Sequence, residues 1–364
     1  MTGFIDCLEG LEDRRKDINK AYELTDIIFL TMAAVVSGAT GWQDIQLFGT
    51  YKLEWLRQYR PFENGIPTRH TIGRIIRGIS AVALMDAFAV WINQQREKSG
   101  HQHIAFDGKT LRGSGHNNHV EAIHMMSAMV AESGITLFQV ESRGKKNEIK
   151  TLQDMLDVIP VKGHVLSADA MHCQKKTLAK ALKKEADVVL QVKDNQKTLK
   201  AEIAAWFHKC QREDADKMQC INETDGGHGR IVERCYRLLP ADDWVSELEE
   251  WSGIKSLVEV SRTHHKKDKI VTEVSYHIST LEKLEKISEV IRQHWRIESH
   301  HWILDVTFHE DESLIYAEDG AKNMALFRRM LLNLAKGHPS KGSMASKLKK
   351  AGWDDDFRTE LLFG

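Results

Sequence analysis

The chain has 364 residues, of which 42% are hydrophobic and 28% are charged. This balance is typical of a globular protein with two or three domains and excludes a disordered chain. The formal net charge of −1 does not indicate a nucleic-acid-binding protein, so any such function depends on local patches.

The cysteines and the apolar segments indicate an intracellular protein without a disulfide framework or a membrane span. The five cysteines are scattered without a CxxC pair, which indicates neither a zinc ribbon nor a disulfide framework and fits a reducing cytoplasm. The most apolar run, residues 27–36, is too short to cross a bilayer. The start of the chain, MTGFIDCLEGLEDRRKD, carries acids where a signal peptide has an apolar centre.

Residues 1 to about 95 predict a compact helical domain. Residues 24–39 have the length of a buried helix, with Thr25 or Asp26 at the start and Gly38 at the end. Residues 42–59 repeat apolar side chains at helical spacing. Two further helical segments, TIGRIIRGI and AVALMDAFAVWINQQR, follow.

The pattern changes to alternating strands and helices from residue 103. HIAFDG reads as a strand, and the two apolar runs after it are joined by Ser133 and Gly134, a hairpin signal. The expected order is β-β-β-α-β-α-β, over residues 103–108, 122–132, 135–143, 147–159, 163–170, 174–186 and 187–195. Helices that cross between strands favour parallel pairing in a mixed sheet.

Residues 200–280 predict further strands, with a charged turn at residues 266–269, and residues 281–306 and 320–337 predict helices. A basic run without acidic residues then covers the stretch between Asp319 and Asp354. It is either a solvated helix face with a tail or a surface that contacts phosphates. Its members are Lys322, Arg328, Arg329, Lys336, Lys341, Lys347, Lys349 and Lys350.

Three acids form a candidate metal site. Asp107 ends the first predicted strand, Asp169 ends the fourth, and Glu298 lies in the late helix. Neighbouring strand ends bring side chains to one edge of a sheet, and a helix packed there can present a third. Close carboxylates repel unless a cation sits among them, and oxygen ligands suit Mg²⁺ or Mn²⁺. Taken singly, Asp107 reads as a turn residue, Asp169 as a helix cap and Glu298 as an exposed charge.

Four segments in this order resemble the DDE-type insertion-sequence transposases, and most of all the ISAs-type group that includes the H-repeat-associated proteins. They are IAFDGKTLRGS, LSADAMHCQ, QVKDNQ and IRQHWRIESHHWILDVTFHED. The front segments LTDIIFLTMAAVVSGATGWQDIQLFG and FENGIPTRHTIGRI resemble the associated N-terminal domain of that group.

The resemblance implies a ribonuclease-H-like α/β catalytic domain with a mixed sheet and a β-rich insertion, preceded by an all-helical domain. Asp107, Asp169 and Glu298 take the places of the metal-binding acids. The implied activity is Mg²⁺- or Mn²⁺-dependent cleavage and strand transfer on double-stranded DNA, by a homodimer or larger assembly on the nucleoid of a bacterial cytoplasm. The expected domains are 1–97 (helical), 98–199 with 281–340 (catalytic), 200–280 (insertion) and 341–364 (basic tail).

The chain departs from the wider superfamily around the late helix. His294 stands where an arginine is usual, Asp305 stands where a lysine is usual, and the usual tyrosine is missing. Which residues hold DNA phosphates is therefore open. The candidates are Lys109, Arg112, Lys193, Asn195, Arg292, His294 and Arg296.

Other interpretations remain. The E-x-x-H pairs at Glu298 and Glu121 match a di-iron arrangement, but the second lies in a predicted strand. The adjacent His264 and His265 are expected to be solvated in the charged turn, and Trp295 and Trp302 to pack in the core. A domesticated DNA-binding relative or a nuclease of the same fold would share most of these features.

Overall fold

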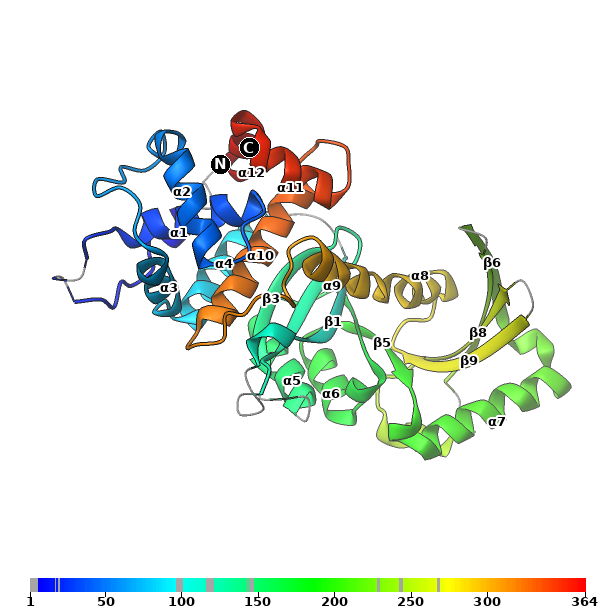
Figure 1. Ribbon diagram of the computed structural model, residues 1–364. Coiled ribbons are helices and arrows are strands. Elements are labelled where there is room, and N and C mark those ends of the chain that lie inside the picture. The colour runs from blue at the N-terminus through cyan, green and yellow to red at the C-terminus, as the bar shows by residue number, and fades with distance from the viewer. Residues whose placement is uncertain are drawn as a thin grey trace. The chain divides into compact units, whose positions relative to one another are not determined.

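The computed structural model describes residues 6–16, 18, 20–95, 101–115, 121–142, 144, 147–227, 230–241, 245–266 and 269–364. The chain forms two compact units, and each unit is built from separate stretches of the sequence. The first comprises Met1–Ser99, Gly108–Lys145 and Ile297–Gly364, and the second comprises Gly100–Asp107 and Lys146–Arg296. Figure 1 labels their elements.

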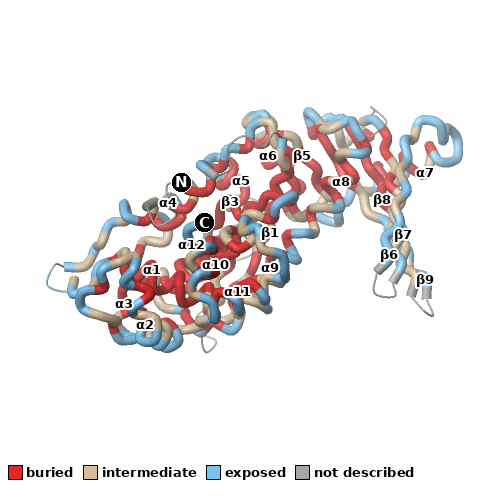
Figure 2. The backbone as a smooth tube through the Cα atoms, turned by 90° about the horizontal axis from the view of Figure 1, so that it is seen from above, coloured by how far each residue is buried: buried red, intermediate tan, exposed pale blue. Residues whose placement is uncertain are grey.

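The first unit is mainly helical, as its N-terminal sequence predicts. Its helices are α1 (Leu24–Val36), α2 (Trp42–Leu56), α3 (Arg69–Arg77), α4 (Ala81–Gln95), α9 (Arg296–Val306), α10 (Gly320–Gly337), α11 (Met344–Trp353) and α12 (Asp355–Phe363). Helices α1 and α10 are buried almost all round (Figure 2) because both carry apolar or internally paired residues on every face.

Three members of the C-terminal basic run belong to this packed core and not to a surface. Arg328 and Arg329 are buried in α10, and Lys347 donates from α11 to the carbonyls of Ala335 and His338. The expectation of a solvated face or a phosphate contact is wrong for these three residues. Residues 344–363 form two helices, and the Arg358 guanidinium stacks on the Trp55 ring at 4.0 Å.

A β-hairpin completes the first unit. Strands β2 (His124–Val130) and β3 (Ile135–Ser142) pair antiparallel, and Gly134 takes the positive φ of +71° that the turn needs. Helix α10 packs on β3, where Asn333 exchanges hydrogen bonds with the backbone of Thr136 at 2.9 and 2.8 Å. The predicted hairpin is confirmed.

The second unit contains the parallel part of the sheet. Strand β1 (His103–Thr110) pairs parallel with β4 (Val165–Ala168), and β4 pairs parallel with β5 (Asp187–Val192). The helices between them are α5 (Glu148–Val158) and α6 (Lys175–Lys183), as the crossover rule requires. Strand β1 runs three residues beyond Asp107, so that aspartate does not end the strand as expected.

An antiparallel extension follows β5. It consists of β6 (Gln219–Gly227), β7 (Arg230–Pro240), β8 (Ser256–Lys266) and β9 (Lys269–Ser279), with β9 beside β5. Helix α8 (Leu284–His294) packs its apolar face on Val165, Val189, Tyr236 and Val258. Helix α7 (Lys197–Glu213), which the sequence analysis did not identify, covers β9 through Phe207 and Tyr276.

Three expectations about this region are wrong. His264 and His265 lie within β8, and His265 pairs with Glu233 at 3.1 Å; residues 267–268 of the predicted turn lie outside the described residues. The helix predicted over residues 281–306 breaks at Trp295 into α8 and α9. Trp302 is 61% exposed, so it does not pack in the core.

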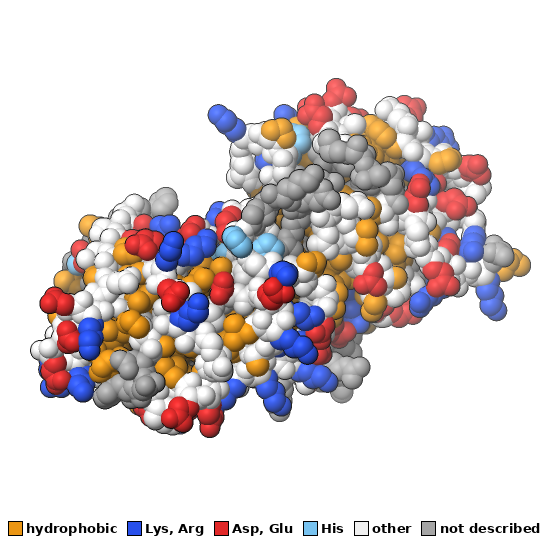
Figure 3. Space-filling view, turned by 180° about the vertical axis from the view of Figure 1, so that it is seen from behind, with side chains coloured by type: hydrophobic (Ala, Val, Ile, Leu, Met, Phe, Trp, Pro, Cys, Tyr) orange, Lys and Arg blue, Asp and Glu red, His pale blue; other side chains and the backbone are white. Residues whose placement is uncertain are grey.

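The strand order is β3-β2-β1-β4-β5-β9-β8-β7-β6, so the fold is mixed α/β with a ribonuclease-H-like β3-β2-β1-β4-β5 core. Among the described residues, no single helix has the length and hydropathy of a membrane span, and one bent pair, Arg69–Arg77 with Ala81–Gln94, meets those criteria only jointly. Basic and acidic side chains are interspersed over the face in Figure 3, in keeping with the net charge of −1.

Candidate active site

Two of the three predicted acids meet at one edge of the sheet in the second unit. The parallel register aligns Phe106 of β1 with Ala168 of β4, so Asp107 and Asp169 are the next residues along the two strands. Neighbouring strands lie about 4.8 Å apart. The four residues before each aspartate are buried, whereas both aspartates are partly exposed. The apolar strands therefore deliver two carboxylates to solvent at the same point.

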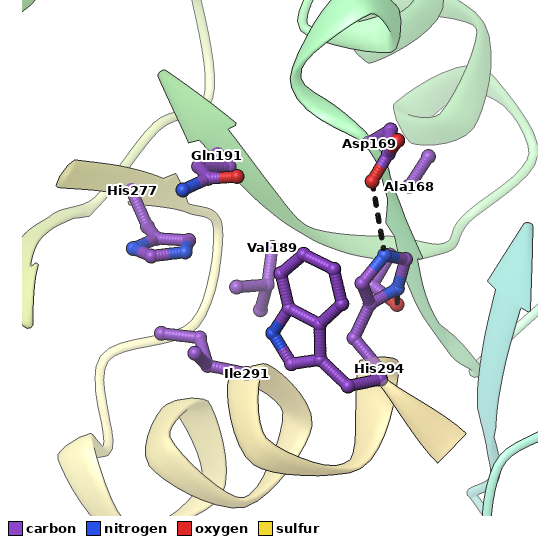
Figure 4. A pocket seen from close by; sticks show the side chains of 9 residues that line it. Ala168, Asp169, Val189, Gln191, His277, Ile291 and His294 are labelled. Atoms are coloured by element: carbon purple, nitrogen blue, oxygen red, sulfur yellow. Dashed lines mark hydrogen bonds and ion pairs between the residues drawn. The ribbon is translucent and has the colours of Figure 1, made fainter. Parts of the chain in front are cut away.

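Asp169 has a histidine partner from the end of α8. His294 Nε2 lies 3.6 Å from Asp169 Oδ1, and Figure 4 shows the two side chains pointing toward each other. The His294 imidazole holds the pKa of Asp169 below its usual range, against the opposing effect of burial. Asp169 is therefore a carboxylate at neutral pH.

The same histidine is held from behind by a buried hydroxyl. Ser167 Oγ lies 2.8 Å from His294 Nδ1 and 2.6 Å from His103 Nε2. Burial lowers the pKa of His103 to about 3, so this ring is neutral. Neither Ser167 nor His103 was predicted as a site residue, although Ser167 stands two residues before Asp169 and His103 four before Asp107.

A small cavity of about 20 Å³ adjoins Asp169, with room for about one water molecule. Polar groups reach it from three strands and one helix (Figure 4). It is lined by Ser167, Ala168, Asp169, Val189, Gln191, His277, Ile291, His294 and Trp295.

Both aspartates act electrostatically on a further histidine, His172. His172 follows Asp169 by three residues and lies 3.8 Å from Glu148. Burial lowers its pKa, while the carboxylates of Glu148, Asp169 and Asp107 act in the opposite direction. The shared influence on His172 agrees with the register in placing the two aspartates together.

Glu298 belongs to the first unit, in the first turn of α9, and its side chain is exposed. It stands four residues after His294 in the chain. Among the residues that the structure describes, no three His, Cys, Asp or Glu side chains form a group that could hold a metal ion. The donor chemistry of the two aspartates nevertheless fits a hard cation, because both are oxygen ligands at one step of the sheet.

Lys109, a predicted phosphate contact, is engaged inside the first unit. It is 7% exposed, and its Nζ lies 2.6 Å from Asp305, 2.8 Å from Asp311 and 3.4 Å from Glu310. Burial alone would lower its pKa, but the carboxylates raise it overall. An ammonium group with three carboxylate partners has no donor left for a phosphate, so the geometry favours a structural role.

The other predicted DNA contacts fall into two groups. In the second unit, Lys193 is exposed at the end of β5 and its charge lowers the pKa of Asp169, while Asn195 donates to the carbonyl of Ala170 at 2.8 Å. Both lie near Asp169. Arg292 and Arg296 are exposed on α8 and α9, and Arg292 lies 3.9 Å from Glu223. In the first unit, Arg112 is 82% exposed and 3.5 Å from Asp311.

A ribonuclease-H-like sheet with two aspartates where the β1 and β4 pairing ends fits the class of DNA transposases. The chain belongs to the transposases with a DDE domain: the Transposase DDE domain family matches residues 98–334, and the DDE_Tnp_1-associated family matches residues 5–92. The family resemblance, the fold class and the transposase function expected from the sequence are confirmed.

Relatives that match over nearly their full length are also named as transposases. The chain is 35% identical to "Putative transposase YncI" of Escherichia coli O157:H7, covering 100% of this chain and 95% of that protein. It is 33% identical to "H repeat-associated putative transposase YhhI" of Escherichia coli K12, covering 97% and 96% respectively. A solved piggyBac transposase synaptic complex with hairpin DNA matches with a TM-score of 0.45 and 10% identity, over 98% of this chain and 76% of that one.

Proposed function

We propose that this transposase cuts phosphodiester bonds at the ends of an insertion sequence and joins the freed 3′ ends to target DNA, with Asp107, Asp169 and Glu298 as its metal-binding acids. The observation that supports the proposal is the in-register alignment of Phe106 with Ala168, from which we infer that the two aspartates lie side by side. Glu298 joins them on the strength of its exposed position in α9 and the family resemblance.

The proposed acids would hold Mg²⁺ or Mn²⁺, and the pair of carboxylates is suited to this because Asp169 is ionised. The bound cation would activate the attacking oxygen and stabilise the leaving oxygen of the phosphodiester. Water first attacks the phosphorus at the element end and releases a 3′ hydroxyl, which then attacks a target phosphodiester. Each step exchanges one P–O bond for another, so no covalent enzyme intermediate is required.

The chain's own residues would bind and align the DNA. Lys193 is an exposed cation beside the carboxylates, and its charge reaches the same edge. We expect it to pair with a phosphate next to the cleaved bond. Arg292 and Arg296 extend positive charge from α8 into α9. Joining two element ends requires two active sites, so we propose a dimer or larger assembly on DNA, on the nucleoid of a bacterial cytoplasm.

The test is cleavage and joining of DNA that carries the inverted repeats flanking the gene. Asp107→Asn, Asp169→Asn and Glu298→Gln are each expected to remove Mg²⁺-dependent cleavage while leaving DNA binding in place. Asp154→Asn and Glu285→Gln are matched controls, because both acids are exposed and lie on helices of the second unit. Full cleavage by any of the first three variants would overturn the assignment of that acid.

The same assay separates two alternatives. Nicking without joining would identify a nuclease of this fold, and binding with neither step would identify a domesticated DNA-binding relative. Presence of all three acids favours an active enzyme over the second alternative.

A further inference from the structure

His294 has a contact with each of two different partners, one on each ring nitrogen. Nε2 faces Asp169 Oδ1 at 3.6 Å, and Nδ1 faces Ser167 Oγ at 2.8 Å. The ring leaves the C-terminal end of α8 and inserts against the end of β4 (Figure 4), so it bridges a helix and the strand that carries the aspartate.

The hydroxyl behind the ring is itself anchored. Ser167 Oγ lies 2.6 Å from His103 Nε2, which comes from β1, the strand that carries Asp107. His103 is fully buried, and Ser167 and His294 are only 4% and 8% exposed. The chain His103–Ser167–His294 therefore ties both aspartate-bearing strands to α8 inside the protein.

This arrangement restricts the His294 ring to one orientation. Turning the ring away would break the hydrogen bond between Ser167 Oγ and His294 Nδ1 inside the protein, which is unfavourable, and would leave the hydroxyl with His103 as its partner. With Nδ1 committed to Ser167, Nε2 is the nitrogen presented to Asp169. The carboxylate selects a proton on that nitrogen, because a lone pair there would repel it.

A ring fixed in this way fixes the carboxylate in turn. His294 Nε2 lies within ion-pair distance of Oδ1 of Asp169, which points to Oδ2 as the oxygen for a cation. A buried partner that orients a metal-binding carboxylate raises metal affinity without touching the metal itself. With both nitrogens engaged and the ring buried, His294 has little to offer a DNA phosphate.

We propose that His294 is a positioning residue that orients the Asp169 carboxylate for a divalent cation, and that Ser167 and His103 hold its ring for this task. The proposal rests on the proposed function, since it takes Asp169 to be a metal-binding acid. It assigns His294 a role different from the phosphate contact expected from the sequence.

The test uses two substitutions that each keep one half of the imidazole. Glutamine places an amide nitrogen near the position of Nε2, whereas asparagine places its amide near Nδ1 and does not reach Asp169. Binding of Mn²⁺ to the full chain is followed by electron paramagnetic resonance, without DNA and without turnover. Thermal unfolding of each variant shows whether the fold is kept.

His294→Gln is expected to retain most of the Mn²⁺ affinity, and His294→Asn to lose about 10- to 100-fold. Ser167→Ala is expected to weaken Mn²⁺ binding several-fold with His294 in place, and it carries the test if His294→Asn does not fold. Equal affinity of the Gln and Asn variants, or no effect of folded Ser167→Ala, overturns the proposal.

The outcome is distinguishable from failure of the proposed function. If Asp107→Asn and Asp169→Asn lose Mn²⁺ binding while the His294 and Ser167 variants do not, the metal site stands and the positioning role is wrong. If the two aspartate variants bind Mn²⁺ like the unaltered chain, the metal site itself is wrong.

Discussion

Lys109 Nζ lies 2.6 Å from Asp305 Oδ1 inside the first unit, although the two residues are far apart in the chain. Lys109 follows Asp107 by two residues on β1, and Asp305 follows Glu298 by seven, or two helical turns, on α9. The ion pair therefore joins the last residues of β1, which belong to the first unit, to α9 of the same unit. It also places a lysine against the position where the wider superfamily has one on the helix.

Removing this lysine is expected to destabilise the first unit. Lys109→Met would leave Asp305, Glu310 and Asp311 close together without their shared cation, and breaking a buried pair in this way costs about 3–5 kcal/mol. Urea unfolding measures the change. Lys162→Met is the control, since Lys162 pairs with Glu185 at a similar 2.8 Å but is 74% exposed, and we expect less than about 1 kcal/mol there. Similar losses for the two variants would contradict a buried role for Lys109.

Acid is expected to destabilise the second unit through two buried histidines. Burial lowers the pKa of both His103 and His277 to about 3. Below the ordinary histidine pKa of about 6.5, the unfolded chain takes up protons that the folded chain refuses. Stability is therefore complete above that pH and falls as the pH drops from about 6.5 toward 3, by at most roughly 1.4 kcal/mol per pH unit for each histidine.

Urea unfolding at pH 7.5 and 5.5 checks this dependence. His277→Gln should reduce the loss between the two pH values, because one of the two groups no longer titrates. A loss that is unchanged in His277→Gln would show that other groups control the acid sensitivity.

Two thiols on neighbouring strands are expected to form a disulfide under oxidation. Cys220 Sγ lies 3.4 Å from Cys235 Sγ, and Cys220 is exposed. Hydrogen peroxide would take two electrons and two protons from the pair, giving one S–S bond and two waters. Mass spectrometry should show a cross-link between the peptides of β6 and β7, absent from Cys220→Ser. Burial and the neighbouring thiol raise the pKa of Cys235 to about 11, so Cys220 is expected to react first. Failure to cross-link in the folded chain would contradict the observed proximity.

Gly113 is expected to tolerate no side chain. A Cβ built there would lie 2.3 Å from the carbonyl oxygen of Ser313 and 2.8 Å from that of Asp311, both backbone atoms. Gly113→Ala should therefore displace residues 311–313, which include the Lys109 partner Asp311, and lower the free energy of unfolding by about 1–3 kcal/mol. Gly337→Ala is the control, because a Cβ there meets nothing within 4 Å. Equal unfolding midpoints for the two variants would contradict the close approach.

Much of the fold follows from local patterns. The apolar run before Asp107 and the alternation of strands and helices after residue 121 predict β1 to β5, because periodicity and turn residues act over a few positions. Helix α7 carries a readable helical pattern at Leu199, Ile203 and Phe207 that the sequence analysis overlooked. Strand β6 is polar and ends in two glycines, so it carries little signal.

By itself, the sequence determined the family, the strands that carry Asp107 and Asp169 and the helical character of the segment around Glu298, because each depends on residues near one another in the chain. Only the tertiary structure decided what surrounds them. Lys109 meets Asp311 across 202 positions, and Ser167 meets His294 across 127. Such partners are chosen by which segments the packed core brings together. Because they are buried, Lys109 forms an internal ion pair in place of the predicted phosphate contact, and His294 orients Asp169.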